Sequence, residues 1–209
     1  MRVGIVGFGR SGTTLVRNMI TNFFSQENRK DKVFADHWYT GYEKKENENE
    51  ILILCRRDLR DVLASGLRGI DSMGPSWNID KMKEPFPKNF KVYKEKYGVT
   101  EDELVKFGNK HIKEGWYDWL PHVKYIFHYE AYMENKQLIA EELAELVDCS
   151  NVDINEAIDF TEWWKQNNPE HITDAKGKTN AWHDIFSKAQ EKIIIDNFGH
   201  WMREYGYIK

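Results

Sequence analysis

The sequence has little cysteine: Cys55 and Cys149 are the two thiols among 209 residues, and they lie far apart along the chain. Neither belongs to a pair with metal-binding spacing, and two cysteines cannot form the disulfide framework of a small secreted scaffold. We therefore expect both thiols to be reduced and the protein to be cytoplasmic.

Long apolar runs are also absent, because no segment approaches the roughly 20 apolar residues of a membrane-spanning helix. The short apolar start, VGIVGFG, leads into Arg10 and a glycine-rich loop, which is unlike a signal peptide. The net charge of −4 gives no general attraction to nucleic acid or to an anionic membrane. The sequence therefore predicts neither of these partners, and it leaves the oligomeric state open. An anion site would have to be built locally.

What is present is an alternation of apolar runs with amphipathic segments. Four apolar runs are typical of buried strands: 2–8, 32–39, 51–55 and 123–130. Six segments have apolar residues at helical spacing: 13–24, 57–68, 100–120, 135–147, 153–166 and 187–207. Glycine and proline predict an irregular segment between 69 and 100. This order favours a three-layer α/β/α protein with a mostly parallel central sheet, folded as one domain over residues 1–209.

The loop GFGRSGTT, residues 7–14, nearly matches the P-loop pattern of glycine, four residues, glycine, lysine, and serine or threonine. Thr13 stands in the lysine position, and the positive charge of the loop is Arg10. Since a strand precedes the loop and a helix follows it, backbone N–H groups and the helix dipole would face an anion. The loop therefore predicts a phosphate site without the lysine that contacts β- and γ-phosphates.

A second anion site is indicated after the apolar run 51–55. Arg56 and Arg57 stand where a nucleotide triphosphatase would need an acidic residue for Mg²⁺. Arg57 could bind a phosphate together with Ser65, two turns into the next helix. In the alternative interpretation, Arg57 and Asp61 form a surface ion pair worth less than about 1 kcal/mol. Two phosphate sites without a magnesium ligand suggest a nucleotide phosphorylated at its 5′ and 3′ positions.

Four segments resemble the sulfotransferases that use 3′-phosphoadenylyl sulfate (PAPS). GRSGTTLV is similar to the 5′-phosphosulfate loop of that family, and RDLRDVLAS is similar to its 3′-phosphate motif. YIFHYEAY resembles its tyrosine–glutamate strand end, and AKGKTNAWHDIFS resembles the C-terminal segment that closes over the nucleotide. The segments come in the family's order and span residues 7–187.

The resemblance implies a P-loop-like sulfotransferase fold and an enzyme that moves a sulfuryl group from PAPS, without a metal, to a hydroxyl or amine acceptor. The acceptor could be a small molecule, a carbohydrate or a peptide. Arg10 would be catalytic, at the bridging oxygen of the leaving group, and Tyr129 would lie against adenine. The implied nucleotide-binding set is Arg10, Ser11, Gly12, Thr13, Thr14, Arg57, Ser65, Tyr129, Lys176, Gly177 and Lys178.

Transfer to such an acceptor also requires a base. Among seven histidines, His37 lies near the end of the run 32–39, twenty residues before Arg57, at a position similar to that of the family's catalytic histidine. We expect His37 to be the base, although the lysine that often precedes it is missing. Asp36 or a residue of the irregular segment remains an alternative. Ala175 replaces a family arginine, for which Lys178 would compensate. Two other functions stay open: a P-loop kinase or triphosphatase with an altered loop, and a nucleotide-binding module without turnover.

Overall fold

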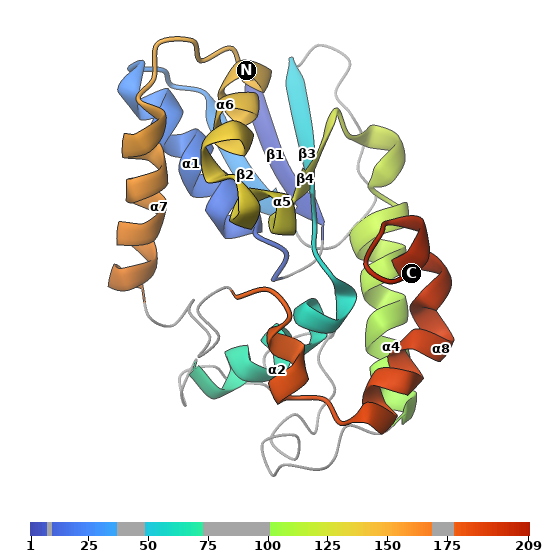
Figure 1. The fold of residues 1–209 in the computed structure, drawn as a ribbon. Coiled ribbons are helices and arrows are strands. Elements are labelled where there is room, and N and C mark those ends of the chain that lie inside the picture. The colour runs from blue at the N-terminus through green and yellow to red at the C-terminus, as the bar shows by residue number, and fades with distance from the viewer. Residues whose placement is uncertain (8–9, 37–48, 73–100, 169–177) are drawn as a thin grey trace. The chain divides into compact units, whose positions relative to one another are not determined.

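The computed structural model describes residues 1–7, 10–36, 49–72, 101–168 and 178–209, without the side chains of 36, 66–72 and 103 (Figure 1). Its contacts divide the chain into two compact units. The first unit consists of Met1–Arg57 and Lys113–Asn167, and the second of Asp58–Ile112 and Asn168–Lys209. The expectation of one domain over 1–209 stays a prediction.

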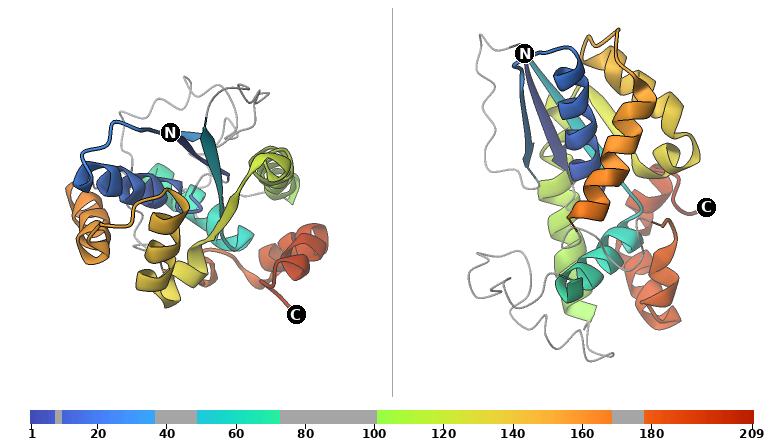
Figure 2. Two further views of the ribbon diagram at one scale, coloured as in Figure 1. Left: turned by 90° about the horizontal axis from the view of Figure 1, so that it is seen from above. Right: turned by 90° about the vertical axis from the view of Figure 1, so that its left-hand side faces the viewer.

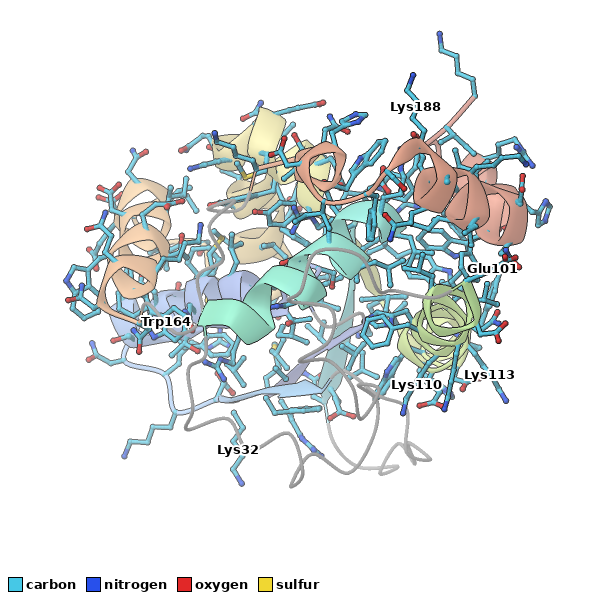
Figure 3. The ribbon with its side chains drawn as sticks, turned by 90° about the horizontal axis from the view of Figure 1, so that it is seen from below. Lys32, Glu101, Lys110, Lys113, Trp164 and Lys188 are labelled. Carbon is cyan, nitrogen blue, oxygen red and sulfur yellow. The ribbon has the colours of Figure 1, made fainter. Side chains whose placement is uncertain are left out.

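The first unit is built on a sheet of four parallel strands in the order β2-β1-β3-β4. The strands are β1 (Arg2–Gly7), β2 (Lys32–Asp36), β3 (Glu50–Arg56) and β4 (Tyr125–His128). Every residue of β3 is buried, as is typical of a parallel strand that is covered on both faces. The exposed side chain of Lys32, by contrast, marks the start of the edge strand β2 (Figure 3).

One face of this sheet is covered by helices of the first unit. α1 (Thr13–Gln26) and α7 (Ile154–Asn167) lie side by side, and α6 (Lys136–Leu146) packs against both (Figure 2). The short helix α5 (Tyr129–Glu134) continues directly from β4 and leads into α6. The core on this face includes Val3, Ile5, Val16, Ile20, Ile51, Ile53 and Phe127.

The opposite face of the sheet is buried as well. It carries Val6, Leu52 and Leu54, which alternate along their strands with the residues of the first face. The π-helical turn η2 (Lys113–Tyr117) packs against β1, and the Arg56 guanidinium of β3 lies 5.7 Å from the centre of the Trp116 ring in this turn. With helical segments on both faces, the structure confirms an α/β protein with a sheet whose described strands are all parallel.

The second unit is helical in its described part. It contains α2 (Leu59–Ser72), α4 (Glu101–Ile112), the 3₁₀ turn η5 (Ala181–Asp184) and α8 (Lys188–Glu204). α4 packs on α8 at Gly108, where a Cβ atom would lie 2.3 Å from the Phe198 ring. α8 starts with a capping box between Ser187 and Gln190, and exposed Lys188 follows this cap (Figure 3).

In the described part of the chain the predicted element order is confirmed, with two corrections. The irregular segment was expected to begin at Gly69, but α2 continues to Ser72. The segment 100–120 was expected to be a single helix, but α4 ends at Ile112 and is followed by η2 and the 3₁₀ turn η3 (Leu120–His122). A π-helical turn accommodates an extra residue and so changes which side chains face the core. Here Gly115 and Trp116 are the buried residues of that turn. Helical periodicity alone does not signal such an insertion.

Candidate functional site

The candidate site lies in the first unit, at the carboxyl edge of the sheet. Val6 of β1 pairs with Asp36 of β2, and Arg56 of β3 pairs with His128 of β4, so these strand ends share one edge. In the order β2-β1-β3-β4, the strand order reverses between β1 and β3. Ligands of open α/β sheets bind beyond the strand ends at such a switch point.

Positive φ values recur at the described residues that connect β1 to α1. Gly7, Arg10 and Gly12 all have positive φ values, of 116°, 71° and 101°. Gly12 occupies the N-cap of α1, where no side chain caps the helix and no acidic residue lies in the first turn. The N–H groups of the first helical turn therefore lack a side-chain cap, and the helix dipole favours a negative charge there.

Arg10 carries the main signal for a bound anion. Its Nη2 atom is buried and has no hydrogen-bond partner among the described residues. Burial lowers the pKa of this guanidinium, and the nearby charge of Arg57 lowers it further. Arginine nevertheless remains protonated in proteins, so the charge is retained at a cost in free energy. An anion bound next to Arg10 would offset that cost.

Arg57 comes directly after β3 and interacts with the loop. Its Nη1 donates a hydrogen bond of 3.3 Å to the carbonyl oxygen of Arg10, and its guanidinium lies 4.5 Å from the centre of the Tyr129 ring. Such a cation–π contact contributes about 0.5–2 kcal/mol, depending on how far water is excluded. The structure therefore brings together three of the predicted site residues, Arg10, Arg57 and Tyr129.

Tyr129, the first residue of α5, also packs against the loop. A Cβ atom at Gly12 would lie 2.9 Å from Cδ2 of Tyr129 and 3.1 Å from Cε1 of Phe127. Position 12 thus requires glycine for two reasons, its positive φ and this close approach. Next to it, Ser11 and Thr13 are buried and Thr14 is half-buried at the start of α1. All five predicted loop residues from Arg10 to Thr14 therefore lie at this edge of the sheet.

A second arginine at the edge, Arg56, bonds to His128, whose role the sequence did not reveal. Arg56 Nη2 donates to His128 Nδ1, because a guanidinium has no acceptor. Burial, and secondly the charge of Arg56, lower the pKa of His128 to about 4. At neutral pH the ring is therefore uncharged with its proton on Nε2, and in this tautomer it has no free nitrogen to act as a base. The contact follows from the pairing of β3 with β4, which the sequence does not show.

The predicted residues of the second unit belong to α2 and to the C-terminal segment. Ser65 is buried in α2, and Lys178 is exposed just before η5. Asp58 caps α2 by accepting the Arg60 N–H at 2.8 Å. Arg57 and Asp61 are only 5% and 2% exposed, so neither lies at the surface, where the alternative interpretation placed an ion pair.

Several predicted residues lie outside the described part of the chain. These are His37, Ala175, Lys176 and Gly177, and for the alternative base Asp36 the backbone alone is described. Of the other histidines, His111 is buried in α4, where its Nδ1 donates to the Phe107 carbonyl at 2.9 Å. The assignment of His37 as the base stays a prediction.

Three further observations concern the chain as a whole. Both cysteines are buried and neither forms a disulfide. Within the described ranges, no helix combines the length and apolar character needed to cross a bilayer. In the same part of the chain, no three side chains of the His, Cys, Asp or Glu type are arranged to hold a metal ion. The expectation of metal-free chemistry stays a prediction.

The chain was also compared with known proteins. No protein-family model matches it, and the curated proteins contain no match either.

Proposed function

We propose that this protein is a PAPS-dependent sulfotransferase with a P-loop-like sulfotransferase fold. The observation that carries the proposal is the buried Nη2 of Arg10, which has no hydrogen-bond partner among the described residues and belongs to a residue with positive φ shortly before the N-terminus of α1. Arg57 adds a second guanidinium at the same loop. This arrangement fits a phosphosulfate, which offers several acceptor oxygens to backbone N–H groups and to arginine.

The proposed reaction transfers a sulfuryl group. An acceptor hydroxyl or amine attacks the sulfur atom, and the bond between sulfur and the bridging oxygen of the 5′-phosphate breaks. The electron pair leaves with adenosine 3′,5′-bisphosphate, and the acceptor proton passes to His37. Arg10 stabilises the charge that develops on the bridging oxygen, which requires a positioned cation rather than covalent help.

The other residues hold the nucleotide. Thr13, Thr14 and the loop amides, with Ser11 and Gly12, bind the 5′ end, while Tyr129 packs on adenine. Arg57 and Ser65, with Lys176, Gly177 and Lys178, bind the 3′-phosphate. The partner is an acceptor of the small-molecule, carbohydrate or peptide class, in the cytoplasm.

A P-loop kinase or triphosphatase fits the described residues less well. Thr13 replaces the lysine that would contact the γ-phosphate. β3 ends at Arg56 and Arg57 follows it, where Mg²⁺ would need a carboxylate. Arg10 and Arg57 fit an anion that arrives without a metal.

The proposal is tested by thermal unfolding with nucleotides in the absence of magnesium. Adenosine 3′,5′-bisphosphate at about 100 times its dissociation constant should add ~2.7 kcal/mol to the free energy of unfolding. AMP at the same concentration should stabilise the protein less, and ATP should not stabilise it more than AMP does. If millimolar bisphosphate leaves the melting temperature unchanged, the proposal is wrong.

Transfer itself is tested by incubating the protein with radiolabelled PAPS and a host-cell extract. A labelled product that forms without magnesium identifies the acceptor. Bisphosphate binding without transfer to any acceptor would favour the inactive nucleotide-binding module. Magnesium-dependent ATP turnover that Thr14→Ala abolishes would favour the kinase or triphosphatase instead.

A further inference from the structure

Asp61 in the first turn of α2 holds a segment that is distant in sequence. Its Oδ2 accepts the Asn180 N–H at 2.7 Å, and its Oδ1 accepts the Trp182 N–H at 3.1 Å. The residue is only 2% exposed, and both carboxylate oxygens bond to the backbone of the same segment. Hydrogen bonds to a charged acceptor are about twice as strong as neutral ones. Asp61 therefore fixes the path of the chain at Asn180–Trp182.

The segment that Asp61 holds has an unusual backbone conformation and a buried tryptophan. Asn180 adopts a left-handed conformation with φ 58°, and the 3₁₀ turn η5 follows at once. The Trp182 ring is buried and lies 4.2 Å from the guanidinium of Arg60, which is itself paired with Asp58 and Glu191. The segment is thus attached to α2 through its backbone and through its tryptophan.

The same face of α2 carries Ser65. Asp61 and Ser65 are four residues apart, so they lie one above the other on the helix, about one turn or 5.4 Å apart. Lys178 is two residues before Asn180, which places its backbone within about 7 Å of the anchored position. The hydroxyl of Ser65 and the ammonium of Lys178 are therefore attached to the same side of the second unit.

We propose that Asp61 is a positioning residue for the 3′-phosphate, which holds the segment of Lys178 against the α2 face that carries Ser65. This inference rests on the proposed function. Asp61 cannot act by touching the ligand, because a carboxylate repels a phosphate. Asp61 must therefore favour phosphate binding indirectly, by holding the hydrogen-bond donors of Lys178 and Ser65 in position.

Because this role is indirect, it predicts a change in phosphate affinity opposite to the one that electrostatics alone would give. Asp61→Asn keeps the size of the side chain and removes a negative charge, so electrostatics alone would tighten phosphate binding. The amide group, however, cannot accept both N–H groups, and the segment should loosen. The measurement is isothermal titration of the full chain with adenosine 3′,5′-bisphosphate and with AMP, which lacks the 3′-phosphate. The matched control is Asp196→Asn, which removes the carboxylate of an exposed helical pair with Lys192.

We expect Asp61→Asn to weaken binding of the bisphosphate by about tenfold, which corresponds to one charge-assisted contact. AMP binding should change by less than about twofold, within the range of a surface substitution. Asp196→Asn should leave both affinities as in the wild type. An unchanged or tighter bisphosphate affinity in Asp61→Asn, or equal losses for both ligands, would overturn the inference.

A second variant keeps the inference testable if Asp61→Asn does not fold. Lys178 is exposed, so Lys178→Ala should fold normally and reduce bisphosphate affinity while sparing AMP. An unchanged preference for the bisphosphate in this variant would contradict the inference. A wild-type protein that does not distinguish the two nucleotides would instead contradict the proposed function.

Discussion

Arg57 donates a hydrogen bond from Nη1 to the carbonyl oxygen of Arg10, so the residue that follows β3 holds the loop that follows β1. The same guanidinium lies over the ring of Tyr129, which packs against Gly12. One side chain thus connects the ends of β1, β3 and β4. Arg57 therefore both offers a positive charge to an anion and holds the loop around Arg10 in its conformation.

Arg57→Ala should weaken binding of adenosine 3′,5′-bisphosphate by ~1.5–3 kcal/mol, the range for a hydrogen bond to a charged group. Arg57→Lys should lose less binding free energy, because lysine keeps the positive charge. It lacks the planar guanidinium, which can stack on a ring and donate hydrogen bonds at the same time. Arg203→Ala, an equal charge loss in the last turn of α8, serves as the control and should bind normally. Titration calorimetry compares the three variants, and wild-type affinity in Arg57→Ala would refute this role.

Gly12→Ala should destabilise the protein and impair nucleotide binding. The alanine would have to adopt φ 101°, and its Cβ would lie 2.9 Å from Tyr129. The backbone strain costs about 1–3 kcal/mol, and the contact with Tyr129 adds to it. Gly206→Ala is a matched control, because Gly206 also has a positive φ, of 78°, but has no atom within 4 Å of the added Cβ.

The difference in the free energy of unfolding between these two glycine variants measures the cost of the close contact of the added Cβ with Tyr129 and Phe127. Urea unfolding should show a larger loss for Gly12→Ala than for Gly206→Ala, and only the former should lose bisphosphate affinity. Equal losses of stability would mean that the ring of Tyr129 moves aside without cost.

His128 should make the stability depend on pH in the acid range. Its pKa is lowered to about 4 by burial and by Arg56, whereas an imidazole in the unfolded chain has a pKa of ≈ 6.5. Between these values the unfolded state binds more protons than the folded state, so the free energy of unfolding rises as the pH rises. This component is complete above the unfolded pKa and contributes about 1–3 kcal/mol between pH 4 and pH 7.

The test compares His128→Gln with the wild type by urea unfolding across that range. Gln has an amide oxygen that can accept from Arg56 but has no group that titrates, so its stability should fall less steeply on acidification. The carboxylates contribute equally to both proteins and cancel in the difference. If the free energy of unfolding of both proteins changes equally with pH, the environment of His128 does not change its proton affinity.

His37→Ala should leave bisphosphate binding unchanged and lower the transfer rate by ~10²–10⁴, the usual contribution of a general base. Transfer of label from PAPS to the identified acceptor measures the rate, and titration measures binding. Asp36→Asn tests the alternative base in the same assay. A wild-type rate in His37→Ala together with a loss in Asp36→Asn would reassign the role.

The order of strands and helices could be predicted because each element carries its own periodic pattern. The glycine loop before α1 was likewise visible, since a glycine turn depends on neighbouring residues. The π-helical turn after Ile112 was not, because one inserted residue hardly changes an apolar pattern.

The tertiary structure alone decided which distant side chains meet. The Arg56–His128 bond spans 72 residues and the bond from Asn180 to Asp61 spans 119. The first depends on the order and register of strands, and the second on how the C-terminal segment packs against α2. Periodicity tells which face of an element is buried, but not which partner covers that face. The residue types and their local shapes therefore follow from the sequence, whereas the pairing of charges follows from packing.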